Sequence, residues 1–142
     1  MDIDWSRLIE MATKVMEYAY APYSGIRVGA ALLCRDGRVF TGVNIENASY
    51  GLTICAERVA VFNAISSGCR DFVALVIASN TEDPLYPCGA CSQVLAEFVE
   101  DIEILSISTT TNKSIKIRLS QVLPIAKDLR NRIANVIKKR YS

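Results

Sequence analysis

Phe72-Val-Ala-Leu-Val-Ile-Ala-Ser79 contains the longest uninterrupted apolar run of the chain, from Phe72 to Ala78. The run has the length of a strand and lacks the alternation of a half-exposed one, so it predicts a central strand covered on both faces. It is far shorter than the ~18 residues that a membrane-spanning helix needs. We therefore expect a sheet built around residues 72–79, with helices on both of its sides.

Helical periodicity flanks this strand. Residues 4–19 predict a helix behind an Asp4 cap. Residues 54–67 predict a second helix, with Thr53 as its cap and Gly68 closing it. The other predicted elements are strands at 27–34, 39–44, 102–109 and 115–119, a helix after a loop at 80–87, and a helical tail at 121–140.

These elements predict a layered α/β fold. Asp36-Gly37 is a strong hairpin signal between the first two strands. Helices cross between the middle strands, which are therefore expected to be parallel. The order α-β-β-α-β-α-β-β-α predicts a three-layer α/β/α sandwich around a mixed sheet of five strands. At 142 residues the chain predicts a single domain over 1–142, with a helical tail from about residue 125.

The composition restricts the classes of binding partner and the cellular compartment that we expect for this protein. Hydrophobic residues make up 51% and charged residues 22%, which excludes disorder. Sixteen Lys+Arg against fifteen Asp+Glu give a net charge of +1, which argues against a surface built to bind nucleic acid. Charged residues in the first turns argue against a signal peptide. We expect a soluble, cytoplasmic protein with no membrane partner.

Five cysteines and no histidine restrict the chemistry. Without histidine, Ser-His-Asp triads, Cys-His dyads and histidine-based zinc proteases are excluded, so any metal must be held by thiolates or carboxylates. An odd number of thiols cannot pair completely, and a cytosolic compartment keeps them reduced. Cys34 ends an apolar strand and Cys69 follows a glycine that ends a helix, so we expect both to be ordinary small residues.

Two cysteine motifs, Cys55-Ala56-Glu57 and Pro87-Cys88-Gly89-Ala90-Cys91, stand at predicted helix starts. A helix N-terminus lowers the pKa of a thiol through its unpaired N–H groups and partial positive charge. Cys88 and Cys91 lie on one face of a first turn, and Cys55 comes from the other helix at the same sheet edge. Three thiolates leave the fourth tetrahedral position of Zn²⁺ open, which is the catalytic arrangement.

Glu57 and Arg58 complete this predicted centre. Three thiolates give Zn²⁺ a net charge of −1, and the two helix dipoles with Arg58 withdraw that excess. Glu57 is two residues from Cys55, close enough to take a proton from water and return it to a substrate. Two alternatives remain at this point: Glu57 as a solvated first-turn residue, and Cys88 with Cys91 as a redox dithiol.

Cys-x-Glu followed by Pro-Cys-x-x-Cys is the signature of zinc deaminases. Over residues 5–124 the chain resembles the small homotetrameric cytidine deaminases. The motifs that carry the resemblance are Ala21-Pro22-Tyr23-Ser24, Val28-Gly29-Ala30-Ala31-Leu32, Gly42-Val43-Asn44-Ile45-Glu46-Asn47-Ala48-Ser49-Tyr50, Cys55-Ala56-Glu57-Arg58 and Pro87-Cys88-Gly89-Ala90-Cys91. Several motifs in family order are more specific than any one of them.

The resemblance implies a reaction and a cofactor. The reaction is zinc-dependent hydrolysis of cytidine or deoxycytidine to uridine or deoxyuridine, with release of ammonia, in pyrimidine salvage. Cys55, Cys88 and Cys91 would hold one Zn²⁺ per subunit. Water activated there would attack C4 of the base, while Glu57 protonates N3 and then delivers a proton to the leaving amine.

The resemblance also implies contacts to a pyrimidine nucleoside. Asn44 and Glu46 match residues that hold the sugar hydroxyls, and the backbone of Ala56 matches a contact to the base edge. Tyr50 matches a residue that reaches into a neighbouring subunit's site, which implies a homotetramer with shared active sites. Ile26 stands where the family carries an aromatic that packs on the pyrimidine. Without the resemblance, Asn44 is a turn former at a strand end and Glu46 a surface charge.

Departures from the family pattern leave alternatives open. Ser92 stands where the family generally has arginine, and the chain continues past Leu123-Pro124 instead of ending on an aromatic over the pocket. Ile26 and the missing terminal aromatic favour another aminated heterocycle or a nucleoside antibiotic as an alternative substrate. The basic tail favours, as a non-enzyme alternative, a zinc-stabilised module that binds RNA. The apolar stripe of the tail predicts docking on the domain or at a subunit interface.

Overall fold

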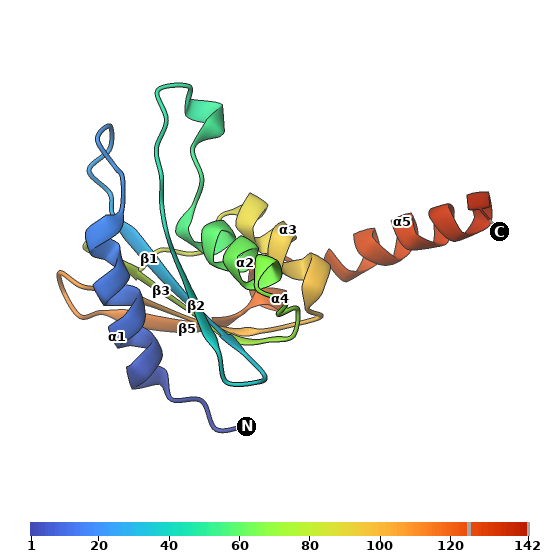
Figure 1. The fold of residues 1–142 in the computed structure, drawn as a ribbon, viewed down its shortest axis with the longest axis horizontal. Helices are drawn as coiled ribbons and strands as arrows, with labels where there is room; N and C mark the ends of the chain where they lie inside the picture. Colours follow the sequence, from blue (N-terminus) through green and yellow to red (C-terminus); the bar gives the residue numbers. More distant parts are fainter. Residues whose placement is uncertain (125, 142) are drawn as a thin grey trace.

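A five-stranded sheet lies at the centre of the structure, a computed structural model that describes residues 1–124 and 126–141 (Figure 1). The strands are β1 Val28–Cys34, β2 Val39–Val43, β3 Phe72–Ser79, β4 Glu103–Ser108 and β5 Ser114–Arg118. They are arranged in the order β2-β1-β3-β4-β5. β3 is antiparallel to β1 and parallel to β4, and most of its residues are buried. The predictions of a central strand at 72–79 and of parallel middle strands are therefore confirmed.

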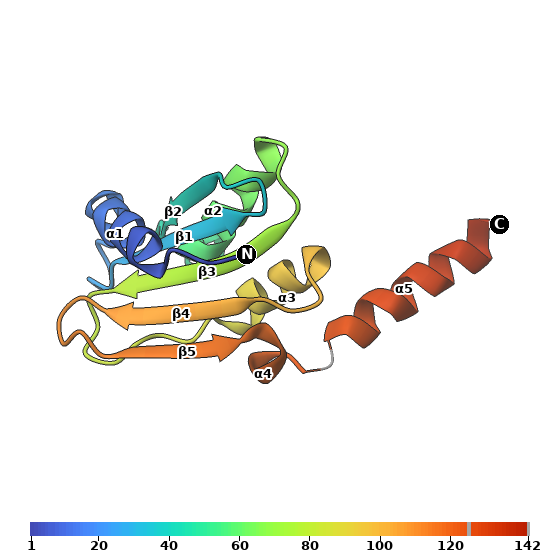
Figure 2. The same cartoon turned by 90° about the horizontal axis from the view of Figure 1, so that it is seen from below.

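Helices cover both faces of this sheet (Figure 2). The α-helices are α1 Trp5–Val15, α2 Ala56–Ser66, α3 Gly89–Phe98, α4 Leu119–Val122 and α5 Ala126–Tyr141, and short 3-10 helices lie at Met16–Tyr18 and Tyr50–Leu52. On one face, Leu8 of α1 packs in a cluster with Val76 of β3. On the other face, Val61 of α2 and Leu95 of α3 pack in a cluster with Ile77 of β3. This arrangement is the predicted three-layer α/β/α sandwich.

The predicted boundaries agree with the observed ones to within two residues for the five strands and for α2. The helix predicted at 4–19 is divided into α1, which ends at Val15, and the 3-10 helix at Met16–Tyr18. The hairpin between β1 and β2 forms as expected, with Gly37 at a φ of +92°. The predicted helix at 121–140 is wrong in one respect, because two helices, α4 and α5, occupy this stretch. Pro124 disfavours helical backbone at Leu123, whose φ and ψ are −144° and 69°, so α4 ends there.

The cap of α1 is confirmed, and the cap predicted for α2 is wrong. Asp4 Oδ1 accepts a hydrogen bond of 3.1 Å from the backbone N of Arg7. At α2, backbone bonds of 3.0 Å in both directions between Ile45 and Ile54 keep the chain extended. The helix consequently begins after Cys55, which takes the N-cap position, and Thr53 instead accepts a bond from a loop amide.

Helix α5 extends away from the sheet in both views (Figures 1 and 2). Its apolar residues Ile133, Val136 and Ile137 are between 51% and 61% exposed. The predicted apolar stripe therefore does not dock on the rest of this chain at these three positions. Within the described ranges, the structure contains no helix long and apolar enough to cross a membrane.

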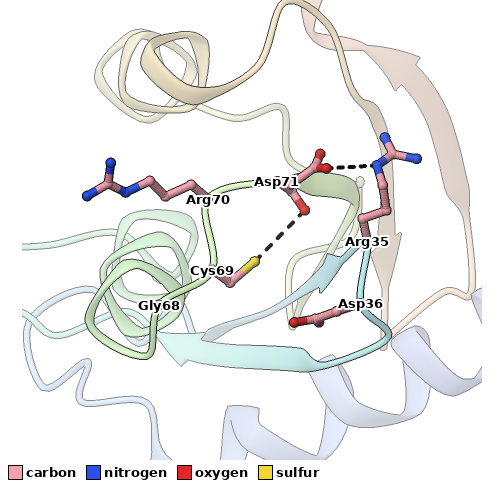
Figure 3. A pocket seen from close by; sticks show the side chains of 6 residues that line it. All are labelled: Arg35, Asp36, Gly68, Cys69, Arg70 and Asp71. Atoms are coloured by element: carbon pink, nitrogen blue, oxygen red, sulfur yellow. Dashed lines mark hydrogen bonds and ion pairs between the residues drawn. The ribbon is translucent and has the colours of Figure 1, made fainter.

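Cys34 and Cys69 form a disulfide, so the prediction that both are ordinary reduced residues is wrong. Cys34 ends β1 at a shift in its register with β3, and Cys69 follows the turn at Gly68, whose φ is +86°. Together these irregularities bring the two Cα atoms to 6.5 Å, within bonding range for the sulfurs. Arg35 and Asp71 pair beside Cys69 at 2.9 Å, along a surface cavity of about 350 Å³ (Figure 3).

Strand direction determines where the cysteine motifs lie. Both β2 and β3 are antiparallel to β1, and they are therefore parallel to each other. Their carboxyl ends lie at the same edge of the sheet, and each leads through a loop into a helix N-terminus, that of α2 or that of α3. Gly42 allows the close approach that this requires, since a Cβ there would lie 2.5 Å from the carbonyl oxygen of Ala56 and 2.4 Å from the nitrogen of Ala60.

We expect Gly42→Ala to lower the free energy of unfolding by about 1–3 kcal/mol, because its methyl group collides with the backbone of α2. Chemical denaturation of the purified variant measures this change. Gly51→Ala is the matched control, since nothing lies within 4 Å of its added carbon. The control should stay within about 0.5 kcal/mol of the unmodified protein. Equal stabilities of the two variants would contradict the packing described here.

Candidate active site

Three cysteine sulfurs converge at the edge where α2 and α3 begin. Cys55 and Cys88 are the N-cap residues of these helices, and Cys91 lies in the first turn of α3. The Sγ atom of Cys88 lies 3.9 Å from that of Cys55 and 3.3 Å from that of Cys91. All three Sγ atoms are within 4.8 Å of one another. The structure therefore brings together the three ligands that the sequence predicts.

The spacing of these sulfurs fits a single zinc ion. Zinc binds thiolates at about 2.3 Å in tetrahedral geometry, which sets neighbouring sulfurs about 3.8 Å apart. The measured separations of 3.3 and 3.9 Å bracket that value. Soft thiolate donors also favour zinc over magnesium or calcium. Among the described residues, no fourth ligating side chain joins this cluster. Three protein ligands would therefore leave one position of the zinc ion for water.

The surroundings of the cluster favour a thiolate at Cys55. A guanidinium nitrogen of Arg58 lies 3.6 Å from the Sγ atom of Cys55. Hydrogen bonding with Cys91 lowers the pKa of the Cys55 thiol, and Arg58 lowers it further. In turn, this bond and burial raise the pKa of the Cys91 thiol. The backbone N of Cys91 donates to the Sγ atom of Cys88 at 3.3 Å, which is the bond expected between an N-cap side chain and the first turn of its helix.

Glu57 is a buried carboxyl beside the cluster. It lies in the first turn of α2 and is only 6% exposed, so the alternative of a solvated surface residue is wrong. Burial, reinforced by the charge on Cys55, raises the pKa of the Glu57 carboxyl to about 7. A carboxyl with a pKa near neutrality is suited to accepting and returning protons.

A cavity of about 220 Å³ opens at this cluster. Its walls come from the ends of β1 and β3, the segment at 53–57, and the loop before α3. The lining residues are Val28, Asn44, Thr53, Ile54, Cys55, Ala56, Glu57, Ile77, Leu85, Tyr86 and Cys88. A mostly apolar cavity that contains metal-ligating thiols and one buried acid is typical of an enzyme active site.

Comparisons with known proteins agree with this chemistry. Residues 3–106 match the model of the cytidine and deoxycytidylate deaminase zinc-binding region. The chain belongs to this deaminase family. It is 48% identical over 122 residues to a cytidine deaminase of Halalkalibacterium halodurans, covering 86% of this chain and 92% of that protein. It is 53% identical over 96 residues to a cytidine deaminase of Sporosarcina psychrophila, covering 68% of this chain and 71% of that protein.

The fold is also similar to that of a solved deaminase. The crystal structure of the cytidine deaminase from Burkholderia pseudomallei matches with a TM-score of 0.81 and 42% sequence identity. The match covers 86% of this chain and 98% of that one.

Of the nucleoside contacts expected from the resemblance, Asn44 and Ala56 line the cavity of this deaminase. The side chain of Asn44 also joins two neighbouring segments. It accepts a bond of 2.9 Å from the Val28 amide and donates one of 2.7 Å to the Ile26 carbonyl. Ile26 itself is 42% exposed and is not among the lining residues.

Glu46 and Tyr50 lie outside the cavity lining. The Glu46 carboxylate accepts bonds from the backbone amides of Tyr23 and Ser24 and from the Ser24 hydroxyl, which lowers its pKa. Within one chain it therefore holds the loop at 21–25. Tyr50 is 76% exposed in the 3-10 helix of a loop that protrudes from the deaminase (Figure 1).

The structure adds wall residues that the sequence reasoning missed. Thr53, Ile54, Leu85 and Tyr86 all line the cavity. A signal for two of them was present, because Leu85 and Tyr86 directly precede Pro87 and its cysteine motif. In α/β sheets, ligands bind beyond the carboxyl ends of strands, and this loop leads from the carboxyl end of β3 to the cysteine motif.

We expect Cys91→Ser to lose its zinc, because a serine hydroxyl is a poorer ligand than a thiolate. Zinc content measured by elemental analysis of the purified deaminase should fall below about a tenth of the unmodified value. Cys69→Ser is the matched control, a buried cysteine away from the cluster. It should keep its zinc and lose about 3 kcal/mol of unfolding free energy with the disulfide. Equal zinc loss in both variants would contradict the assignment.

Proposed function

We propose that this protein is a zinc-dependent cytidine deaminase that converts cytidine or deoxycytidine and water to the uracil nucleoside and ammonia. The observation that carries this conclusion is a cluster of three cysteine sulfurs, two of which, those of Cys55 and Cys88, belong to residues that line one cavity with the buried Glu57. The names of the relatives support the same activity. A role in pyrimidine salvage in the cytoplasm is the setting that we propose for it.

Cys55, Cys88 and Cys91 would hold the zinc ion in this reaction. Bound zinc supplies a Lewis acid that makes water a nucleophile near neutral pH. Arg58 and the two helix N-termini offset the charge of three thiolates, which would otherwise weaken that acidity. Arg58 contacts the Sγ atom of Cys55 and would thereby also fix the orientation of this ligand.

Glu57 would move the protons of the reaction. The base must gain a proton at N3 as water adds to C4, and the departing amine must gain another before it leaves as ammonia. A carboxyl whose pKa lies near neutrality can take a proton from water and return it at each of these atoms. Because Glu57 is buried beside the cysteine cluster, this transfer takes place away from bulk solvent.

The remaining nucleoside contacts are assigned by resemblance and position. Ala56 lies at the cavity wall at the start of α2, where its backbone N–H is free of helix partners and suited to the base edge. Asn44 would contact the sugar from the wall that it lines. Glu46 would contact the same sugar, next to the loop at 21–25 that its carboxylate holds.

We expect Glu57→Gln to lower kcat for cytidine by about 10²–10⁴-fold, because the amide cannot carry protons. The loss of cytidine absorbance measures the rate, and elemental analysis should show unchanged zinc. Glu46→Gln is a comparison at a carboxylate outside the cavity lining, where the effect should fall mainly on KM. Full activity of Glu57→Gln would refute the assigned role.

A second candidate function is deamination of another aminated heterocycle, such as a nucleoside antibiotic. The observation that favours it is the position of Ile26, which is not an aromatic residue and does not line the cavity. The assay described above, repeated with a panel of aminated nucleosides, separates the two candidates. A clear preference for cytidine removes the second one.

We also propose that the active enzyme is a homotetramer whose subunits complete one another's sites. The cavity of one chain, about 220 Å³, is smaller than the ~300–1,000 Å³ of most ligand sites. Tyr50 and Leu52 are 76% and 70% exposed on a protruding loop, and Phe62 of α2 is 46% exposed. Large exposed apolar side chains of this kind typically mark surfaces that contact another protein.

Sedimentation equilibrium should give a mass four times the 15.6 kDa of the chain. We expect Leu52→Asp to weaken the assembly by about tenfold or more, because the interface would then bury an unpaired charge. Cytidine turnover should fall with dissociation. Tyr18→Ala serves as a control at another exposed aromatic side chain. A fully active monomer would contradict the shared site and leave the proposed reaction standing.

A further inference from the structure

One aromatic side chain stands at the wall of the catalytic cavity. Among the described residues that line it, Tyr86 is the one with an aromatic ring, and its neighbours there are Leu85 and Cys88. Tyr86 is 63% exposed, so protein atoms cover the smaller part of this residue. The ring therefore offers a free apolar surface beside the cysteine cluster.

Ile26 does not offer such a surface. It lies outside the cavity lining, and its carbonyl is held by the side chain of Asn44 at 2.7 Å. Its branched aliphatic side chain also has no π-face on which a planar ring can stack. A flat heterocycle that enters the cavity of this chain meets an aromatic face at Tyr86.

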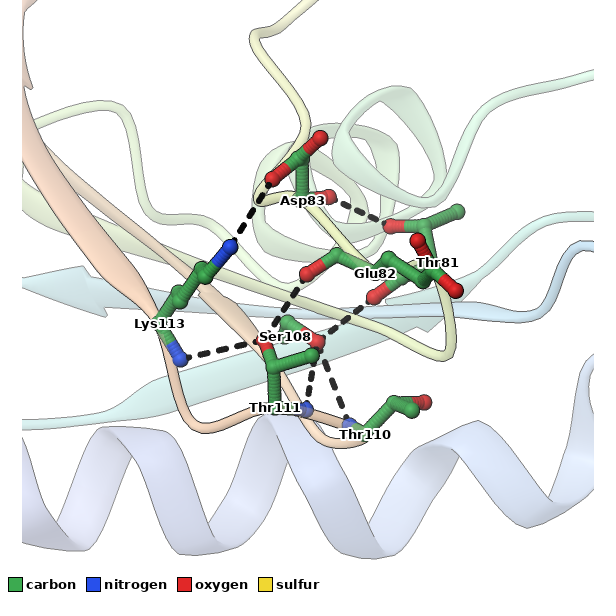
Figure 4. Close-up of polar contacts among 7 residues, drawn as sticks. All are labelled: Thr81, Glu82, Asp83, Ser108, Thr110, Thr111 and Lys113. Carbon is green, nitrogen blue, oxygen red and sulfur yellow. Dashed lines mark hydrogen bonds and ion pairs between the residues drawn. The ribbon is translucent and has the colours of Figure 1, made fainter.

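The loop that carries Tyr86 is anchored to the turn between β4 and β5 (Figure 4). The buried Ser108 hydroxyl donates to the carbonyl of Thr81 at 2.5 Å. The Thr111 hydroxyl donates to the carbonyl of Glu82 at 2.8 Å. These bonds fix the first half of the loop to a neighbouring part of the sheet.

The other end of the loop is fixed to α3 and to the core. Leu85 packs against the main hydrophobic cluster, and the Ser92 hydroxyl lies 3.5 Å from the carbonyl of Pro87, to which it donates. Cys88 then caps the helix. The backbone at Tyr86 is thus held on both sides while its ring stays accessible, which lowers the entropy lost when a ligand packs on it.

We propose that Tyr86 is a specificity-determining residue whose ring packs on the planar base of the substrate. The proposal rests on the proposed function, because it concerns the substrate of the same cavity. Replacing an aromatic residue that stacks on a base by alanine weakens binding by about 5- to 150-fold. A contact present both in the bound substrate and during the reaction affects KM more than kcat.

The experiment compares cytidine deamination by the unmodified enzyme, Tyr86→Ala and Tyr86→Phe. We expect Tyr86→Ala to raise KM about tenfold or more and to change kcat by less than about threefold. Calorimetric titration with the product uridine should show the same loss of affinity. Tyr86→Phe should retain both values, because it keeps the ring. Tyr18→Ala, a 77% exposed tyrosine outside the cavity lining, should change neither.

A KM and a uridine affinity of Tyr86→Ala within about twofold of the unmodified enzyme would overturn the proposal. A loss in Tyr86→Phe as large as that in Tyr86→Ala would also overturn it, since the hydroxyl would then carry the effect. Unchanged zinc content and melting temperature exclude a folding defect. If the proposed function is wrong, the unmodified protein itself does not deaminate cytidine, and this result is distinct from an effect of the Tyr86 substitutions. Uridine binding still decides the role of Tyr86 in that case, and its absence overturns both proposals.

Discussion

The shared direction of β2 and β3 is the constraint on which the site depends. Because β1 is antiparallel to both, their carboxyl ends emerge at one edge of the sheet. Each end leads to a helix N-terminus, and a cysteine occupies the N-cap position of each helix, Cys55 in α2 and Cys88 in α3. If either strand ran the other way, the two thiols would lie at opposite edges. The metal cluster is therefore a consequence of topology, and the loops only adjust it.

The convergence of the two helix N-termini also offsets the negative charge that three thiolates would carry. Three thiolates close together repel one another and weaken a bound metal as a Lewis acid. Two helix N-termini and the Arg58 guanidinium place positive charge against them from the protein side. Burial, and after it the charge on Cys55, stabilises Glu57 in its protonated form. The packing that gathers the cysteines therefore also favours the protonated form of the acid beside them.

The helices and strands that were predicted correctly follow from local sequence patterns, whereas the features that were predicted wrongly depend on tertiary contacts. The apolar run at 72–79 and the spacing of Cys88 and Cys91 indicate the central strand and the ligands without any structure. The disulfide of Cys34 with Cys69 depends on a register shift and a turn that no periodicity encodes. The start of α2 depends likewise on a bridge between Ile45 and Ile54. Such features arise from pairing between distant segments.

Chemistry and substrate choice occupy different parts of the architecture. Cys55, Cys91 and Glu57 lie at helix starts that the core holds rigidly, so their geometry tolerates little change. Tyr86 lies on a loop whose backbone is anchored by side chains from the β4–β5 turn, outside the catalytic cluster. A substitution at Tyr86 can therefore alter the cavity wall without moving a metal ligand. Because this loop carries part of the cavity wall and the helix starts carry the proposed zinc ligands and acid, such a fold can change its substrate while it keeps its reaction.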